Sequence, residues 1–141
     1  MTTSNPSCLI KGIHHINLLV KDLAVAVARY QQVLGVDEMI FAELEHRGMR
    51  CARFSVGGTW IVLVQPTDPE GVPGRHLAEH GEGLFLMSFE VDSLEDAALI
   101  TEQKSGRFLS DEPRQGLEDW RVLDLDPDQF FGARLQLISE G

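Results

Sequence analysis

Two adjacent histidines stand at the head of an apolar run in "IHHINLLVKDL", residues 13 to 23. A neutral imidazole can take up and return a proton near neutral pH, so His15 is a candidate general base. Because side chains alternate across a strand, His14 points to the opposite face, where packing is the better interpretation. His15 is therefore the first candidate for chemistry, and a buried structural histidine is its alternative.

Two further side chains have types that could act on a ligand. Cys51 is flanked by Arg50 and Arg53, and positive neighbours that lower the pKa of a thiol make it a nucleophile. A cysteine within an apolar strand is more often a small buried side chain, and we give that interpretation more weight. Gln136 could orient a polar group of a ligand, or it could close the end of a sheet with a hydrogen bond.

The elements that must position these residues occur twice in the chain. Asp22 predicts the start of a helix with an apolar stripe, and Gly35 predicts its left-handed end. Aligning Gly35 with Gly106 leads to a second helix of the same kind. We expect Asp92 with Glu95 to cap this helix and Gly106 to end it. The repetition indicates an internal duplication.

Strand-like runs surround both helices. "HHINLLV" and "LFLMSFEV" come before them, and "RCARFSV", "TWIVLVQ", "WRVLDL" and "ARLQLIS" follow. Each half therefore reads β-α-β-β-β. We predict a single domain, 1–141, with one module at about 11–66, a linker with one short helical turn at about 67–82, and a second module at about 83–139. The expected fold class is α+β, in which helices cover the outer faces and curved mixed sheets form a cleft for a ligand.

Composition narrows the class of partner. The net charge of -10 and the lack of a basic cluster argue against nucleic acid as a partner. The apolar stretches are too short for a membrane span, and the polar N-terminus has no secretory signal, so we expect a cytoplasmic protein without membrane contact. In that reducing compartment the two cysteines are expected to remain thiols.

The motifs "HHINLLVKDL…YQQVLG", "GEGLFLMSFEVDSL" and "DPDQFFGARLQLIS" together resemble the vicinal oxygen chelate superfamily, over about residues 11–139. The resemblance is closest to the methylmalonyl-CoA epimerase-like branch, through "GEGL…FEVDSLE", "DEPR" and "FGARLQL". It implies a glyoxalase-like fold and a homodimer. A fold transfers between relatives more safely than a function does.

The resemblance also implies a divalent metal site with four ligands, one on the first strand and one on the last strand of each module. It puts His15 at the first position, and the offset that aligns the two helices puts Leu86 at the symmetric one. In the last strands of the modules, a slightly longer offset sets Val62 against Gln136. Leucine and valine have no lone pair to donate, so we expect no metal and no other cofactor.

The position that resembles the epimerases' catalytic glutamate falls on Cys51. The acid-base pair of that branch is therefore incomplete as well. A metal site rearranged around other carboxylates is the least favoured alternative; it would use Glu43, Glu45 or Glu90.

Strand alternation from His15, Val62 and Leu86 predicts the lining of the cleft, although the facing of Trp120 stays open. The expected substrate-binding residues are Asn17, Trp60, Val62, Leu86, Ser88 and Trp120. This mostly apolar lining suits a small organic ligand. We expect a metal-independent isomerase or lyase that acts on a carbonyl-containing metabolite, with His15 as acid-base group and Gln136 or Asn17 holding the carbonyl oxygen. The alternative is a non-catalytic protein that sequesters an aromatic or hydrophobic compound, as antibiotic-resistance members do.

Overall fold

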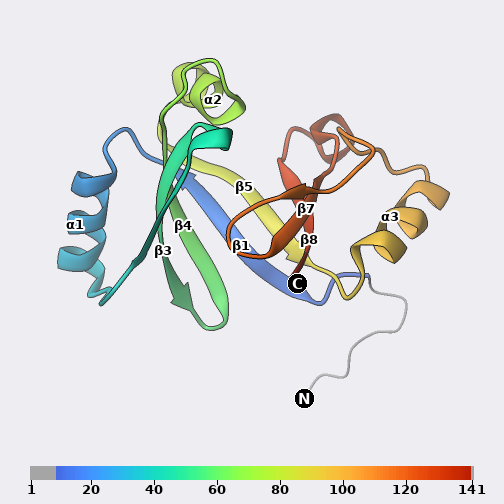
Figure 1. Cartoon of the computed structure of the whole chain (residues 1–141), viewed down its shortest axis with the longest axis horizontal. Coiled ribbons are helices and arrows are strands. Elements are labelled where there is room, and N and C mark those ends of the chain that lie inside the picture. Colours follow the sequence, from blue (N-terminus) through green and yellow to red (C-terminus); the bar gives the residue numbers. More distant parts are fainter. Residues whose placement is uncertain (1–8, 141) are drawn as a thin grey trace. The chain divides into compact units, whose positions relative to one another are not determined.

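The computed structural model describes residues 9–140, and the chain divides into two compact units. The contiguous unit runs from His15 to Phe85, and the split unit combines the residues up to His14 with those from Leu86 onward. Both units contain the expected sequence of one strand, one helix and three strands (Figure 1). The prediction of two β-α-β-β-β modules in an α+β fold is confirmed.

The contiguous unit builds a four-stranded mixed sheet. Strand β1 (Gly12–Leu19) leads to α1 (Leu23–Leu34), and the remaining strands are β2 (Ile40–Leu44), β3 (Met49–Val56) and β4 (Thr59–Pro66). The order across this sheet is β2-β3-β4-β1, in which β1 and β4 are parallel and the other pairs are antiparallel. A crossover through α1 is what allows β1 to lie parallel to β4.

The split unit repeats this plan. Its elements are β5 (Gly83–Glu90), α3 (Leu94–Gln103), β6 (Arg114–Gln115), β7 (Trp120–Asp124) and β8 (Leu135–Glu140). The order is β5-β8-β7-β6, with β5 parallel to β8 and the other pairs antiparallel. The parallel pair again joins the first and the last strand of the module.

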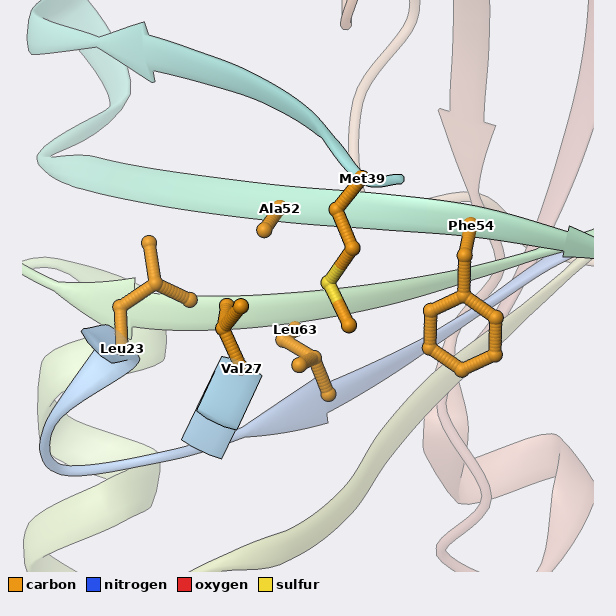
Figure 2. Packing of buried hydrophobic residues seen from close by; sticks show 6 residues of the cluster. All are labelled: Leu23, Val27, Met39, Ala52, Phe54 and Leu63. Carbon is orange, nitrogen blue, oxygen red and sulfur yellow. The ribbon is translucent and has the colours of Figure 1, made fainter. Parts of the chain in front are cut away.

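One helix covers one sheet face in each unit. Leu23 and Val27 of α1 pack on Ala52, Phe54 and Leu63 of β3 and β4, together with Met39, as Figure 2 shows. The equivalent core below α3 consists of Val91, Leu94, Ala97, Leu123, Leu125 and Leu137. These apolar side chains fill the helix side of each sheet. Buried polar side chains on the opposite face therefore do not belong to these two cores.

Helix α1 begins and ends as predicted. The Asp22 carboxylate accepts a hydrogen bond from the Val25 N–H at 3.2 Å, and Gly35 ends the helix with a φ of 68°. Leu34, the last residue of the helix, is 67% exposed.

Helix α3 corrects two expectations. Its cap is Ser93, whose hydroxyl accepts from the Asp96 N–H at 3.2 Å, while Asp92 forms an exposed ion pair with Lys11. The left-handed residue is Ser105, with a φ of 68°, and not Gly106. Glycine is still required at 106, because a Cβ there would lie 2.3 Å from Cγ2 of Thr101.

The expected linker holds more structure than one turn. Helix α2 (Val72–His80) spans nine residues. Pro73 lies in its first turn, a position that tolerates a missing N–H, and the buried Gly74 packs closely on the carbonyl of Asp68. His76 and His80 lie on this helix with their rings 4.5 Å apart.

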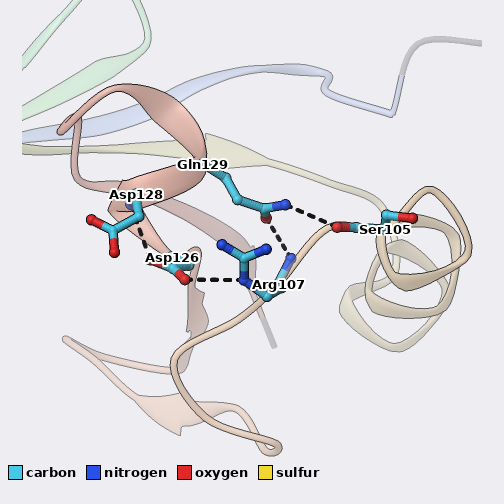
Figure 3. A network of polar contacts seen from close by, with 5 residues as sticks. All are labelled: Ser105, Arg107, Asp126, Asp128 and Gln129. Carbon is cyan, nitrogen blue, oxygen red and sulfur yellow. Dashed lines mark hydrogen bonds and ion pairs between the residues drawn. The ribbon is translucent and has the colours of Figure 1, made fainter.

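Two short 3-10 helices complete the units. The first, η1 (Glu45–Arg47), follows β2, so Glu45 lies just outside that strand. The second, η2 (Pro127–Phe130), lies between β7 and β8. Gln129 of η2 accepts from the Arg107 N–H and donates to the Ser105 carbonyl, and the Arg107 side chain pairs with Asp126 (Figure 3). This network fastens the loop after α3 to the end of β7.

In the described residues, no helix is both long enough and apolar enough to cross a membrane.

Candidate functional site

In the contiguous unit, strand register brings the first-strand candidates together. His15 lies opposite Trp60 and Asn17 opposite Val62 in the parallel β1–β4 pair. Leu63, next to Val62, packs under α1, so these four side chains belong to the sheet face away from the helix. His15 is 4% exposed, and the Asn17 side-chain oxygen is buried without a hydrogen-bond partner among the described residues.

Arg53 adds a buried positive charge to this face. It lies opposite Val62 in the β3–β4 pair and is only 4% exposed. Its guanidinium lies over the ring of Trp60, 4.8 Å from the ring centre, a cation-π contact that strengthens as water is excluded. From the sequence, Arg53 was predicted only to be a neighbour of Cys51. The available signal was a charged residue inside the otherwise apolar run "CARFSV".

Cys51 lies on the same strand face, two residues before Arg53. Its side chain is 1% exposed, and burial raises the pKa of its thiol to about 11, although the charge of Arg53 lowers it in part. A thiol with that pKa is almost wholly protonated at neutral pH. This environment argues against the nucleophile interpretation and for the small buried side chain.

Cys51 also lines a pocket of about 480 Å³ at the start of α1. The cross-strand pair Glu43 and Arg50 and the exposed Phe41 stand at its wall. Gln65 lines it as well, and its side-chain oxygen accepts from the Leu23 N–H at 2.8 Å.

In the split unit, Ser88 and Gln136 are register partners in the parallel β5–β8 pair. Ser88 is 0% exposed and Gln136 is 4% exposed. The Ser88 hydroxyl oxygen and the Gln136 side-chain oxygen are both buried without a hydrogen-bond partner among the described residues. Because such groups are normally satisfied, these two oxygens indicate a place where a ligand or water completes the structure.

Two residues that the sequence analysis did not select fix the orientation of Gln136. Its amide nitrogen donates to Asp124 Oδ1 at 2.8 Å. Arg114 donates to both oxygens of the same carboxylate, at 2.9 and 3.2 Å. A fork of two charge-assisted bonds holds the carboxylate in one position. Arg114 is the last residue of the "DEPR" motif, and Asp124 is a polar residue within the apolar run "WRVLDL"; these were the available signals.

The two modules place these four residues, Asn17, Val62, Ser88 and Gln136, at equivalent positions. The offset that aligns the two helices takes Asn17 to Ser88, and the offset that aligns the last strands takes Val62 to Gln136. The structure pairs Asn17 with Val62 and Ser88 with Gln136 in the same kind of parallel register. The register thus supports the duplication that was inferred from the sequence.

Trp120 and His14 form a separate buried pair. The two rings meet edge to face at 4.5 Å, and His14 Nε2 lies 2.8 Å from a carboxylate oxygen of Glu140. Both rings are nearly inaccessible, with exposures of 4% and 5%. This contact gives Trp120 a packing role, while its predicted role in binding substrate stays a prediction.

The expected metal positions offer few donors. Val62 is buried and Leu86 is half-buried, and both are aliphatic. Glu43, Glu45 and Glu90 are exposed, and no group of three His, Cys, Asp or Glu side chains suited to a metal occurs between residues 9 and 140.

The chain has recognisable relatives. Residues 14–123 match the family described as the glyoxalase/bleomycin resistance protein/dioxygenase superfamily. Mitochondrial methylmalonyl-CoA epimerase of Mus musculus is 26% identical over 135 residues, 95% of this chain and 76% of that protein.

Solved structures show the same fold. Methylmalonyl-CoA epimerase from Mycobacterium tuberculosis superposes with a TM-score of 0.91 at 23% identity, covering 98% of this chain and 93% of that one. A variant of the Streptomyces coelicolor methylmalonyl-CoA epimerase in complex with 2-nitronate-propionyl-CoA gives 0.85 at 28% identity, covering 94% and 96%. The expected glyoxalase-like fold is confirmed.

Proposed function

The chain belongs to the glyoxalase/bleomycin resistance protein/dioxygenase superfamily, and on that premise we propose that it is an isomerase acting on an acyl-CoA thioester. The proposal draws its substrate class from relatives named as methylmalonyl-CoA epimerases and from a related structure with a CoA ligand. Within the chain, one observation carries it. The face of the contiguous unit away from α1 buries an imidazole, an amide and a guanidinium close together in register.

These groups suit removal of a proton beside a carbonyl. His15 takes the proton from the carbon next to the thioester carbonyl, and the imidazolium returns it after the planar enolate has turned its other face to the ring, which inverts that carbon. Negative charge then develops on the thioester oxygen. Asn17 donates a hydrogen bond to that oxygen, and the guanidinium of Arg53, held by Trp60, stabilises the charge in a site with little water.

The donor set does not fit a divalent metal, so no step of this proposal passes through one. Two of the four expected ligand positions hold Val62 and Leu86, which have no lone pair. We propose that the protein works without a metal. Elemental analysis of protein purified without chelator tests this: we expect well under one equivalent of divalent metal per chain, and a stoichiometric metal lost in His15→Ala would contradict it.

A test of the reaction compares solvent exchange with binding. Incubation with methylmalonyl-CoA and propionyl-CoA in D₂O, followed by NMR of the proton next to the carbonyl, should show exchange with the wild type. His15→Gln should slow exchange by roughly 10²- to 10⁴-fold, the usual contribution of an acid-base group, and leave affinity within about tenfold. His80→Gln changes an exposed histidine and serves as the matched control.

A second candidate function is sequestration of an aromatic or hydrophobic compound without turnover. The aliphatic side chain of Val62, beside the ring of Trp60 on the same sheet face, favours it because it enlarges the apolar surface of the contiguous unit. Ligands that bind the wild type but show neither exchange nor conversion would establish this function and exclude the isomerase.

We propose that the protein is a cytoplasmic homodimer. The free, buried thiol of Cys51 is consistent with a reducing compartment. The family resemblance supports the dimer, as do Ile40 and Phe41 on β2, which are 47% and 61% exposed. Light scattering on a sizing column should give twice the chain mass, and Phe41→Glu should lower it.

A further inference from the structure

The split unit presents two buried oxygens whose surroundings define what they can bind. The Gln136 amide nitrogen donates to Asp124 Oδ1 at 2.8 Å, and Arg114 holds the Asp124 carboxylate in place. The amide oxygen of Gln136 therefore points away from the carboxylate. The reverse orientation would place two oxygens together. Gln136 therefore offers an acceptor, and a ligand must bring the hydrogen.

Ser88 supplies the complementary capacity. A hydroxyl both donates and accepts, and the Ser88 hydroxyl lies on the neighbouring strand in register with Gln136. Neighbouring strands are about 4.8 Å apart, so one oxygen atom of a ligand can reach both side chains. Each of the two oxygens is buried and without a partner in the described part of the chain.

The charge balance selects a neutral group. Arg114 pairs with Asp124, and neither Ser88 nor the Gln136 oxygen carries a formal charge. An ammonium group would lose its water without gaining an anionic partner, and a carboxylate would meet an acceptor. A ligand hydroxyl fits both atoms, because it donates to Gln136 and accepts from Ser88.

We infer that Ser88 and Gln136 form a binding site for a neutral hydroxyl of a ligand, and that Asp124 is the residue that positions Gln136 for it. This inference rests on the proposed function for its ligand class alone: the ligand of the split unit is a hydroxylated acyl-CoA thioester. The same chemistry would also apply to a hydroxylated ligand of another class.

The direct test measures affinity by calorimetry for matched probes. The pairs are 3-hydroxybutyryl-CoA with butyryl-CoA, and lactyl-CoA with propionyl-CoA. We expect the wild type to bind the hydroxylated member of at least one pair about tenfold more tightly. Gln136→Met, which keeps the length and removes the acceptor, should bring the ratio close to one, and Ser88→Ala should reduce it.

The role of Asp124 has its own readout. Acetoacetyl-CoA offers a ketone acceptor where 3-hydroxybutyryl-CoA offers a donor, so the ratio of their affinities reports which end of the Gln136 amide faces the ligand. Asp124→Asn releases the amide and should lower the preference for 3-hydroxybutyryl-CoA over acetoacetyl-CoA at least threefold. Asp126→Asn breaks the Arg107 ion pair of the same unit and should leave the ratio unchanged. An equal loss for both probes in Asp124→Asn would show a merely structural role.

The outcomes separate this inference from the proposed function. Hydroxyl ratios within threefold for every pair overturn the inference, even if the thioesters undergo exchange, because a buried water then satisfies both oxygens. If no thioester binds, the proposed function fails, and benzyl alcohol against toluene takes over as the probe pair. A preference for the alcohol that is lost in Gln136→Met upholds the site, and equal binding or no binding of the two overturns it.

Discussion

At the scale of single residues, the candidate functional groups are buried polar side chains that lie inside β-strands. Cys51 shows how far burial changes such a group. Its thiol pKa of about 11 results from desolvation, which outweighs the opposing charge of Arg53. The thiolate is the reactive form of cysteine, so the raised pKa predicts a slow reaction.

We expect Cys51 in the Cys8→Ser variant to react with iodoacetamide at pH 8 at least about 100-fold more slowly in the native state than in urea. The shift of the pKa from 9.0 to about 11 lowers the thiolate fraction by that factor, and exclusion of the reagent adds to it. Mass spectrometry of timed samples measures both rates. Equal rates would mean that β3 opens readily or that the thiol is activated.

The same shift predicts how stability depends on pH. The folded-state pKa is raised, so the contribution of the protonated thiol is fully present below pH 9.0 and is lost as pH rises to about 11. Urea midpoints measured across this window should fall in the wild type. In Cys51→Ala the decline should be shallower, and an identical decline would assign it to other groups.

Which residues would carry the site was only partly visible in the sequence. Alternation from His15 predicted that Asn17 shares its sheet face, as the register shows, because a strand period of two leaves no choice once one residue is assigned. Arg53 and Asp124 escaped notice. Their importance comes from contacts to Trp60 and Gln136, which are set by register between strands and not by any local pattern.

At the scale of elements, caps and glycines decided where the helices begin and end. The stripe and cap of α1 were readable because Asp22 stands directly before the first apolar residue. In α3, Asp92 and Ser93 compete for the cap, and sequence cannot separate neighbours of equal propensity. The length of α2 was not predicted, because "EGVPG" has the composition of a turn. The first turn of a helix nevertheless tolerates Pro73, and Gly74 permits close packing on Asp68.

The caps predict unequal effects for two adjacent substitutions. Ser93→Ala removes an acceptor for the Asp96 N–H and should lower the free energy of unfolding by about 1 kcal/mol, as cap losses do. Asp92→Ala removes only an exposed ion pair with Lys11, and should change it by less than about 0.5 kcal/mol. Urea unfolding of both variants measures the difference. A larger loss of stability for Asp92→Ala than for Ser93→Ala would identify Asp92 as the cap.

At the scale of the whole molecule, charge is the dominant feature. The chain has 22 acidic residues against 12 basic ones. Mutual repulsion of like charges destabilises a compact state, and salt screens it. The exposed ion pairs are screened too, but isolated pairs of this kind contribute little.

We therefore expect added salt to stabilise the protein. Raising NaCl from about 20 to about 300 mM shortens the Debye length well below 10 Å and should increase Tm by roughly 2–4 °C, equivalent to about 1 kcal/mol at this size. Calorimetry at several NaCl concentrations measures the change, and sucrose of matched osmolality is the control. A fall in Tm would show that the ion pairs outweigh the repulsion.

The division into a contiguous and a split unit gives the two modules different histories during synthesis. All residues of the contiguous unit have been made once Phe85 leaves the ribosome, so it can fold while the rest is still being translated. The contact of His14 with its carboxylate partner forms later, because Glu140 lies 126 positions further along the chain. One strand, β1, thus joins a side chain that finds its neighbours early, His15, to one that finds them only when the chain is almost finished.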